Sequence, residues 1–167
     1  MRARVISNRE VAANIFLLTL RSASLADACE PGNFVMVRVS EGYFPLLRRP
    51  LSVHDVVGDT VSLLFEVRGI GTRCLSSVRP RQEIDLLGPL GNGFPAIARE
   101  HRVLLVGGGV GIAPFAFLVR RLRSQEPTHP IHLFAGARTA GRIAALGSFR
   151  ERGVELSLAT EDGSAGW

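Results

Sequence analysis

The stretch VLLVGGGVGIAP, residues 103–114, runs an apolar strand pattern straight into closely spaced glycines that precede a helix-forming segment. Glycines permit positive φ angles and let a ligand approach the backbone, and the N-terminus of a following helix favours a pyrophosphate. The pattern departs from the G-x-G-x-x-G dinucleotide fingerprint, because Ile112 occupies the third glycine position. A tight strand-to-helix turn without a ligand is the alternative. The glycines in question are Gly107, Gly108, Gly109 and Gly111.

Downstream of these glycines, apolar strand patterns alternate with helix patterns. This alternation is typical of parallel βαβ units, and we expect helices on both faces of the sheet. Ligands of such sheets bind at the carboxyl ends of the strands, so the ends after Val106, Ala135 and Ala159 should face one crevice. The expected strands span residues 102–107, 131–136 and 154–160, and the expected helices span residues 112–125 and 141–153.

The segment EDGS, residues 161–164, directly follows the last expected strand. Its place at a carboxyl strand end makes Glu161 and Asp162 candidates for contact with a bound nucleotide. An ordinary Asp-Gly turn is an equally good interpretation of the same residues.

The first half of the chain has a different character. Six short apolar runs alternate with Gly, Pro, Asp and Asn at spacings typical of an antiparallel barrel or sandwich, with one short helix expected at residues 71–78. The fold class is therefore β + α/β: an antiparallel β domain at residues 1–98, then a partial parallel-sheet α/β domain at residues 99–167.

The segment RRPLS, residues 48–52, places a doubled positive charge in one of these strands. An arginine supplies a planar fork for a phosphate, and Ser52 lies within reach of a flavin bound beside the strand. Gly71 and Thr72, at the start of the short helix, offer a second pyrophosphate cradle. The alternative for Arg48 and Arg49 is a solvated strand edge that guards against aggregation.

Composition narrows the functional classes. The net charge is +5, but all 20 basic residues are arginines without a long run, so we expect no nucleic-acid role. No window reaches the roughly 18 apolar residues of a membrane span, and no secretory signal precedes the first strand, so we expect a cytoplasmic protein without membrane association. Cys29 and Cys74 are 45 positions apart, which favours neither a zinc site nor a disulfide framework.

Five motifs in fixed order carry a resemblance. RRPLS, EVRGIGT, LGPLGNGF, LLVGGGVGIAP and EDGS are similar to motifs of the ferredoxin reductase superfamily, and within it to the flavin-containing electron-transfer subunits of dihydroorotate dehydrogenase B. The resemblance implies an N-terminal FAD-binding β-barrel and a C-terminal NAD-binding α/β domain. It also implies hydride exchange between nicotinamide and flavin without a catalytic side chain. Electrons would pass to a catalytic dihydroorotate dehydrogenase subunit that converts dihydroorotate to orotate in pyrimidine biosynthesis.

The same resemblance assigns the binding residues. FAD would be held by Arg49, Pro50, Leu51, Ser52, Leu64, Phe65, Glu66, Gly71 and Thr72. NAD(H) would be received by Gly107, Gly108, Gly109, Gly111, Glu161 and Asp162. The loop after the second parallel strand contains no acidic residue, so Arg138 could instead accept the 2′-phosphate of NADP.

One departure from the family is clear. Its members carry four clustered cysteines that ligate a [2Fe–2S] cluster, and this chain has only two distant cysteines and ends at Trp167. We therefore expect either a fragment of a longer protein or a shortened relative. Two further hypotheses stay open: an NAD(P)H-dependent flavin reductase component of another redox system, and a truncated flavin-binding module without catalysis.

Overall fold

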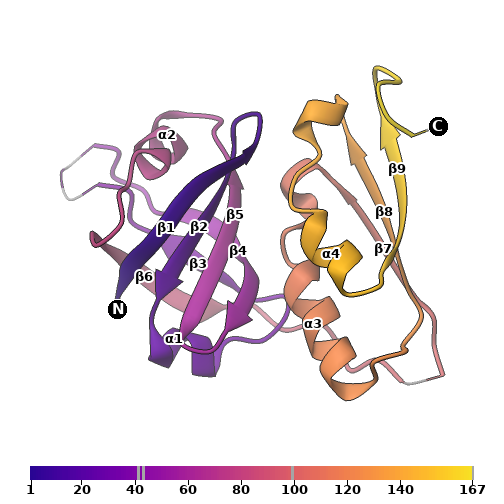
Figure 1. Cartoon of the computed structure of the whole chain (residues 1–167). Coiled ribbons are helices and arrows are strands. Elements are labelled where there is room, and N and C mark those ends of the chain that lie inside the picture. The colour runs from indigo at the N-terminus through magenta and orange to yellow at the C-terminus, as the bar shows by residue number, and fades with distance from the viewer. Residues whose placement is uncertain (41, 43, 99, 167) are drawn as a thin grey trace.

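The computed structural model describes residues 1–40, 42, 44–98 and 100–166. In its first half, antiparallel strands close into a six-stranded barrel in the order β1-β2-β5-β4-β3-β6 (Figure 1). The strands are β1 (Arg2–Ala12), β2 (Ile15–Arg21), β3 (Phe34–Val37), β4 (Arg49–Val57), β5 (Thr60–Glu66) and β6 (Glu83–Leu90). The sequence left a barrel and a sandwich open, and the structure confirms the barrel.

Side-chain alternation along β5 explains how the barrel is filled. Val61, Leu63 and Phe65 point inward, where Phe65 stacks on Phe16 with ring centroids 5.7 Å apart. Leu64 breaks the alternation, because it is also buried, in a second hydrophobic cluster with residues of the α/β domain. The outer face of β5 is therefore apolar where the second domain packs against it.

Two short helices accompany the barrel. The helix α2 (Ile70–Ser76) confirms the one expected at residues 71–78. The helix α1 (Ala23–Ala28) was not predicted, and it buries Leu25 and Ala26 against the barrel. Six residues give less than two turns, which is too short for a helical apolar period to stand out in the sequence.

The second half forms a parallel sheet in the order β7-β8-β9. Its elements are β7 (Val103–Gly108), the 3₁₀ helix η1 (Gly109–Ile112), α3 (Phe115–Gln125), β8 (Ile131–Ala137), the 3₁₀ helix η2 (Ala140–Arg142), α4 (Gly147–Glu151) and β9 (Glu155–Thr160). The three parallel strands confirm the sequence prediction. The predicted domain boundary between residues 98 and 99 falls in the connection from β6 to β7 and stays a prediction, because Arg99 lies outside the described residues.

The helix expected at residues 141–153 is wrong in its extent. The segment instead forms η2, an irregular connection and the five-residue α4. Ala145, in the connection, has a φ of 56°, which an α-helix does not accommodate. The helix expected from residue 112 begins only at Phe115, because Gly109–Ile112 forms η1 and Pro114 occupies the N-cap position of α3.

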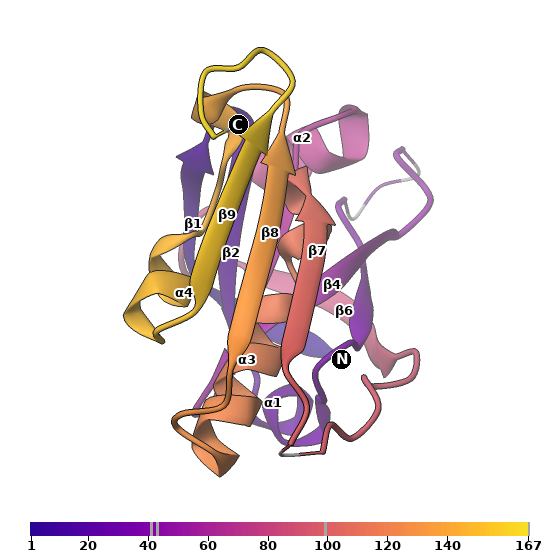
Figure 2. The same cartoon turned by 90° about the vertical axis from the view of Figure 1, so that its right-hand side faces the viewer.

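The expectation of helices on both sheet faces is also wrong. Figures 1 and 2 show α3 and α4 on one face, between the sheet and the barrel. Both crossovers step in the same direction, from β7 to β8 and from β8 to β9, and right-handed crossovers in one direction place their helices on the same face. The opposite face leaves Leu104, Val106 and Phe134 exposed by 60%, 73% and 40%.

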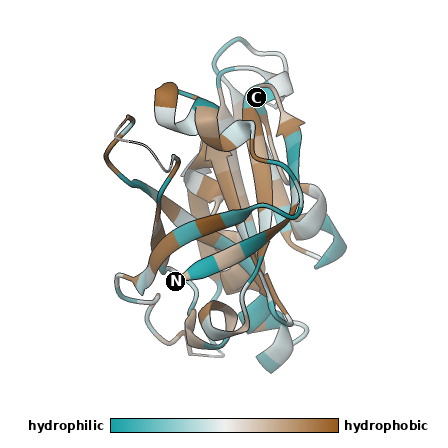
Figure 3. Cartoon of the chain, turned by 90° about the vertical axis from the view of Figure 1, so that its left-hand side faces the viewer, coloured by the Kyte–Doolittle hydropathy of each residue, from teal (hydrophilic) through white to brown (hydrophobic). Residues whose placement is uncertain are grey.

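A second exposed apolar segment lies on the barrel. Phe44, Leu46 and Leu47, in the loop between β3 and β4, are 72–73% exposed, and this loop stands out in brown in Figure 3.

Among the described residues, no helix combines the length and the hydropathy that a membrane crossing requires.

Polar contacts at the end of β4 join the two halves. Asp55 accepts hydrogen bonds from Arg120 on α3, at 2.7 and 3.1 Å, and from Arg152 after α4, at 3.0 Å. Next to it, Nδ1 of His54 lies 2.7 Å from the carbonyl oxygen of Ala113. Because that oxygen can only accept, Nδ1 carries the proton of this hydrogen bond. A buried histidine and a buried carboxylate thus help to hold the α/β domain on the barrel.

His54 should make the stability of the protein depend on pH. Burial lowers the pKa of His54 below its ordinary value of 6.5. Between the folded and unfolded pKa values only the unfolded chain holds the proton, so the free energy of unfolding should fall as the pH drops below about 6.5 and level off below the folded pKa. Urea unfolding across this range measures the effect. His54→Gln keeps an N–H donor without a titrating ring, and an unchanged pH profile in this variant would contradict the assignment.

Candidate functional site

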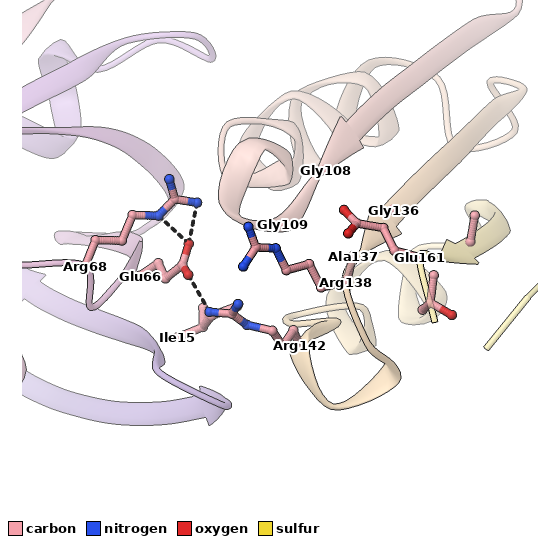
Figure 4. A pocket seen from close by; sticks show the side chains of 12 residues that line it. Ile15, Glu66, Arg68, Gly108, Gly109, Gly136, Ala137, Arg138, Arg142 and Glu161 are labelled. Carbon is pink, nitrogen blue, oxygen red and sulfur yellow. Dashed lines mark hydrogen bonds and ion pairs between the residues drawn. The ribbon is translucent and has the colours of Figure 1, made fainter. Parts of the chain in front are cut away.

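A cleft of about 850 Å³ separates the barrel from the carboxyl end of the parallel sheet (Figure 4). The barrel contributes Ile15 at the start of β2 and Glu66 and Arg68 at the end of β5. The sheet side contributes Gly108, Gly109, Gly136, Ala137, Arg138, Arg142, Ala159, Thr160 and Glu161. The cleft therefore belongs to both halves of the chain.

The three carboxyl strand ends meet in this cleft. Gly108 of β7 is in register with Gly136 of β8, and Gly136 is in register with Ala159 of β9. All three residues line the cleft. The prediction that these strand ends face one crevice is confirmed.

The glycines of the opening stretch have separate structural roles. Gly109 has a φ of 53°, a conformation that favours glycine, and lines the cleft together with Gly108. Gly107 does not line it: a Cβ there would lie 3.0 Å from both Ile112 Cγ2 and Phe115 Cε2, so this glycine allows η1 and α3 to pack closely on β7. Gly111 is not among the lining residues either, and a Cβ there would meet no atom within 4 Å.

Charged side chains face each other across the cleft. Glu66, with its side chain only 12% exposed, accepts from Arg68 at 2.7 Å through one oxygen and from Arg142 of η2 at 2.5 Å through the other. The Glu66–Arg142 pair joins the barrel to the α/β domain. Sequence reasoning selected Glu66 but missed Arg68, Arg142 and Ile15, because nothing in the local sequence signals a contact between positions 66 and 142.

The two arginines of RRPLS point to different partners. The guanidinium of Arg48 donates to the Asp85 carboxylate at 2.5 Å and to the Asp85 carbonyl oxygen at 3.1 Å, and this contact lowers the pKa of the Asp85 carboxyl. Arg48 thus ties the start of β4 to β6. The alternative of a solvated strand edge does not describe Arg48, because its side chain is paired with Asp85 and only 29% exposed. For Arg49 the alternative stays open, because β4 pairs with β3 at Arg49–Ser52 but with β5 only from Val53 onward.

Arg49 lies against the start of α2. A Cβ on Gly71 would be 2.8 Å from the guanidinium carbon of Arg49, so a side chain at this position would displace the Arg49 guanidinium. Arg49 also donates to the Leu47 carbonyl oxygen at 2.6 Å. The structure therefore brings together Arg49 and Gly71, two of the residues predicted for the FAD pyrophosphate.

Thr72 has a structural task in the same turn. Its hydroxyl oxygen accepts from the backbone N–H groups of Arg68 at 2.9 Å and Gly69 at 3.2 Å, and the hydroxyl donates to the Gly69 carbonyl oxygen. The hydroxyl holds the turn between β5 and α2 in shape, and the contact of Thr72 with a phosphate stays a prediction.

The other predicted flavin residues share the barrel end with Arg49. The side chains of Leu64 and Phe65 are buried in the two hydrophobic clusters, so only their backbone can line a ligand. Leu51 and Ser52 are half-buried on β4, and Pro50 is exposed. Their contact with FAD stays a prediction.

The two acidic residues of the EDGS segment fit different interpretations, one the ordinary Asp-Gly turn and the other contact with a bound nucleotide. Asp162 accepts from the backbone N–H of Ser164 at 3.0 Å and from its hydroxyl at 2.6 Å, and these hydrogen bonds lower the pKa of the Asp162 carboxyl. Asp162 therefore behaves as a turn-forming aspartate. Glu161 lines the cleft and is the carboxylate of this turn that a ligand there would meet.

The two cysteines lie apart from the cleft. Cys29 is buried at the end of α1, and burial raises the pKa of its thiol to about 11, while Cys74 lies in α2. Within the described residues, no group of three or more His, Cys, Asp or Glu side chains is arranged to hold a metal ion.

Comparison with curated proteins gives long matches. The chain is 37% identical over 167 residues to the dihydroorotate dehydrogenase B (NAD(+)), electron transfer subunit, of Desulforamulus reducens, covering 99% of this chain and 63% of that protein. It is 40% identical over 166 residues to the subunit of the same description from Bacillus velezensis, covering 97% and 64%. The chain thus spans less than two thirds of the length of these relatives. No protein-family model matches it.

A solved structure is similar over the same extent. It is that of the NADH-dependent reduced ferredoxin-NADP oxidoreductase, described in relation to flavin-based electron bifurcation. The TM-score is 0.84 at 32% sequence identity, with 98% of this chain and 58% of that chain covered. This structural similarity agrees with the barrel and the three-stranded sheet on which the cleft is built.

Proposed function

Because the chain belongs to the ferredoxin reductase superfamily, we propose that it binds FAD on the barrel and NAD(H) on the parallel sheet, and that it transfers electrons between them. The observation that carries this proposal is the shared cleft. The carboxyl strand ends of the α/β domain and the end of β5 face each other across it, with Glu66 and Arg142 in contact between them. Two rings bound to the two halves would meet there.

The barrel offers a fitting place for FAD. Arg49 supplies a fixed positive fork beside the glycine turn of Gly71, which suits a pyrophosphate. The backbone of Leu64–Glu66 and the Ser52 hydroxyl would approach the ring system. FAD, when bound, would take up a hydride from NADH and release its electrons singly. The residues of the chain would bind and orient the two nucleotides and shield them from water. None of these residues would act as an acid, a base or a nucleophile.

The partner follows from the relatives. They are named as electron transfer subunits of dihydroorotate dehydrogenase B, so we assign this chain to the transfer of electrons between NAD(H) and a separate dihydroorotate-oxidising subunit. Dihydroorotate oxidation to orotate, in pyrimidine biosynthesis, would take place on that subunit. The two distant cysteines of this chain do not supply the four clustered thiolates of a [2Fe–2S] site.

A second candidate is an NAD(P)H-dependent flavin reductase component of another redox system. The similarity to the ferredoxin-NADP oxidoreductase chain, at 32% identity, supports this flavin reductase function as the second candidate. Both candidates require turnover of NAD(P)H at the flavin. A flavin-binding module without catalysis requires none.

The proposal is tested by the visible spectrum of the purified chain. We expect flavin absorption bands that bleach when NADH is added without oxygen, because nucleotides bound on the two sides of the cleft would lie close together. Recovery of the bands on addition of air controls for loss of flavin. Bound FAD that NADH and NADPH leave unbleached would favour the non-catalytic module, and a chain that retains no added FAD would overturn the proposal.

A further inference from the structure

The strand β4 carries a β-bulge just after its predicted flavin residues. Val53 is in register with Leu63 of β5, and the neighbouring Ser62 is already in register with Asp55, so His54 is an extra residue on β4. In a regular strand, successive side chains alternate between the two faces. Here Val53 belongs to the barrel core, whereas both His54 and Asp55 contact the α/β domain. The bulge therefore places two consecutive polar side chains at the domain interface.

The hydrogen bond of His54 reaches the strand-to-helix turn that follows β7, residues 108–113. Nδ1 of His54 donates to the carbonyl oxygen of Ala113 at 2.7 Å, and Ala113 is the residue between η1 and Pro114 at the start of α3. His54 and Ala113 are only 4% and 2% exposed, so water does not compete for this hydrogen bond. His54 therefore ties the strand with the predicted flavin residues to the end of the strand-to-helix turn.

Apolar contacts hold the same turn from the barrel side. Ile112 and Ala113 are buried in one hydrophobic cluster with Ile15 of β2 and Leu64 of β5. Such burial is non-directional, so it keeps the turn on the barrel without setting its exact place. A hydrogen bond has a narrow range of distances and angles. We therefore attribute the position of the turn relative to β4 to the contact of His54.

The position of this turn matters for the proposed electron transfer. Ser52 precedes His54 by two residues on β4, and the turn supplies Gly108 and Gly109 to the sheet side of the cleft. For a hydride to pass from NADH to the flavin, the reacting atoms must lie about 3–3.5 Å apart, and a misplacement of about 1 Å can cost about a hundredfold in rate. The two sides of the cleft must therefore be held at a fixed separation.

We propose that His54 is a positioning residue for hydride transfer. Through its hydrogen bond to Ala113 it holds the strand-to-helix turn at the separation from β4 at which bound NADH reduces the flavin. His54 does not line the cleft, so it acts without contact to either nucleotide. The inference rests on the proposed function, since it concerns the reaction of that same cleft. The role differs from that of Asp55, whose arginine partners lie on α3 and after α4.

Reduction of the bound flavin by NADH, followed by stopped-flow absorption without oxygen, tests this role. His54→Leu and His54→Asn introduce side chains of nearly the same shape, but only asparagine offers an N–H group in the place of Nδ1. We expect His54→Leu to lower the limiting reduction rate about ten- to a hundredfold. In His54→Asn, the limiting rate should stay within about threefold of the parent.

Binding should be far less sensitive than the rate. In both variants, the affinity for FAD and the NADH concentration that gives half the limiting rate should change by less than about threefold, because His54 contacts neither nucleotide. A general loss of structure would instead change affinity and rate together. His101→Leu is the matched control, because His101 is an exposed histidine in the connection between β6 and β7, and it should change none of these quantities.

Each other outcome contradicts a stated claim. A parent-like limiting rate in His54→Leu would overturn the inference, and so would equal slowing in His54→Leu and His54→Asn. A weaker affinity for NADH with an unchanged limiting rate would assign His54 to binding and overturn it as well. If His54→Leu does not fold, His54→Asn decides alone, and a loss of more than about tenfold in its limiting rate contradicts the inference. A parent chain whose bound flavin NADH does not reduce would overturn the proposed function itself.

Discussion

Replacing Asp55 with alanine is expected to lower the free energy of unfolding by about 2–4 kcal/mol. The Asp55 side chain is only 11% exposed and accepts from Arg120 and Arg152, which belong to the other half of the chain. Without it, two half-buried guanidiniums lose their carboxylate at the domain interface, and the removal of one partner of a buried pair is more costly than the net value of the pair. Urea unfolding followed by circular dichroism measures the change.

The matched control for Asp55 is Asp59→Ala. Asp59 pairs with Arg21 at 3.1 Å at the end of the same hairpin, but both side chains are more than half exposed. Solvent screens such a pair, so the loss should stay below about 1 kcal/mol. Equal effects of the two substitutions would mean that the Asp55 contacts do not hold the interface.

Asp55 also connects stability with the cleft. The cleft exists only where the barrel and the sheet face each other, and Asp55, His54 and Glu66 are among the barrel residues whose polar contacts hold that arrangement. We therefore expect the loss of Asp55 to weaken NADH binding even though this residue does not line the cleft.

The parts of the fold that the sequence predicted are those with a local signal. The glycine run after β7 and the apolar patterns identified a parallel sheet and an antiparallel barrel or sandwich, because side-chain periodicity is a property of neighbouring residues. The family resemblance selected the barrel. The same logic located Gly108, Gly109 and Glu161, which lie at strand ends that the patterns mark, whereas Glu66 was assigned through the family resemblance. Helix α4 was overextended because Ala145, with its positive φ, carries no local sign of a break.

The contacts that complete the site have no such signal. Arg142 is 76 positions from Glu66, and Arg48 is 37 positions from Asp85. In a sequence containing 20 arginines, nothing distinguishes an arginine in a cleft from one in solvent. The placement of both helices on one sheet face likewise depends on strand order, which the sequence pattern leaves open.

Replacing Arg49 with alanine is expected to weaken FAD binding about ten- to a hundredfold, or roughly 1.5–3 kcal/mol, because a charge-assisted contact to the pyrophosphate is lost. Fluorescence titration of the flavin-free chain measures the affinity. Arg4→Ala removes an exposed arginine on β1 and should leave it unchanged. Gly71→Ala provides an independent route to the same effect, because its Cβ would push the Arg49 guanidinium away while the charge is retained.

A comparison with FMN separates a phosphate contact from general damage to the barrel. FMN lacks the pyrophosphate bridge, so the parent chain should prefer FAD, and Arg49→Ala should reduce that preference more than it weakens FMN itself. If Arg49 acted only by keeping β4 and α2 together, both flavins would weaken alike and the unfolding midpoint would fall. FAD bound as tightly by Arg49→Ala as by the parent would contradict the assignment of Arg49 to the pyrophosphate.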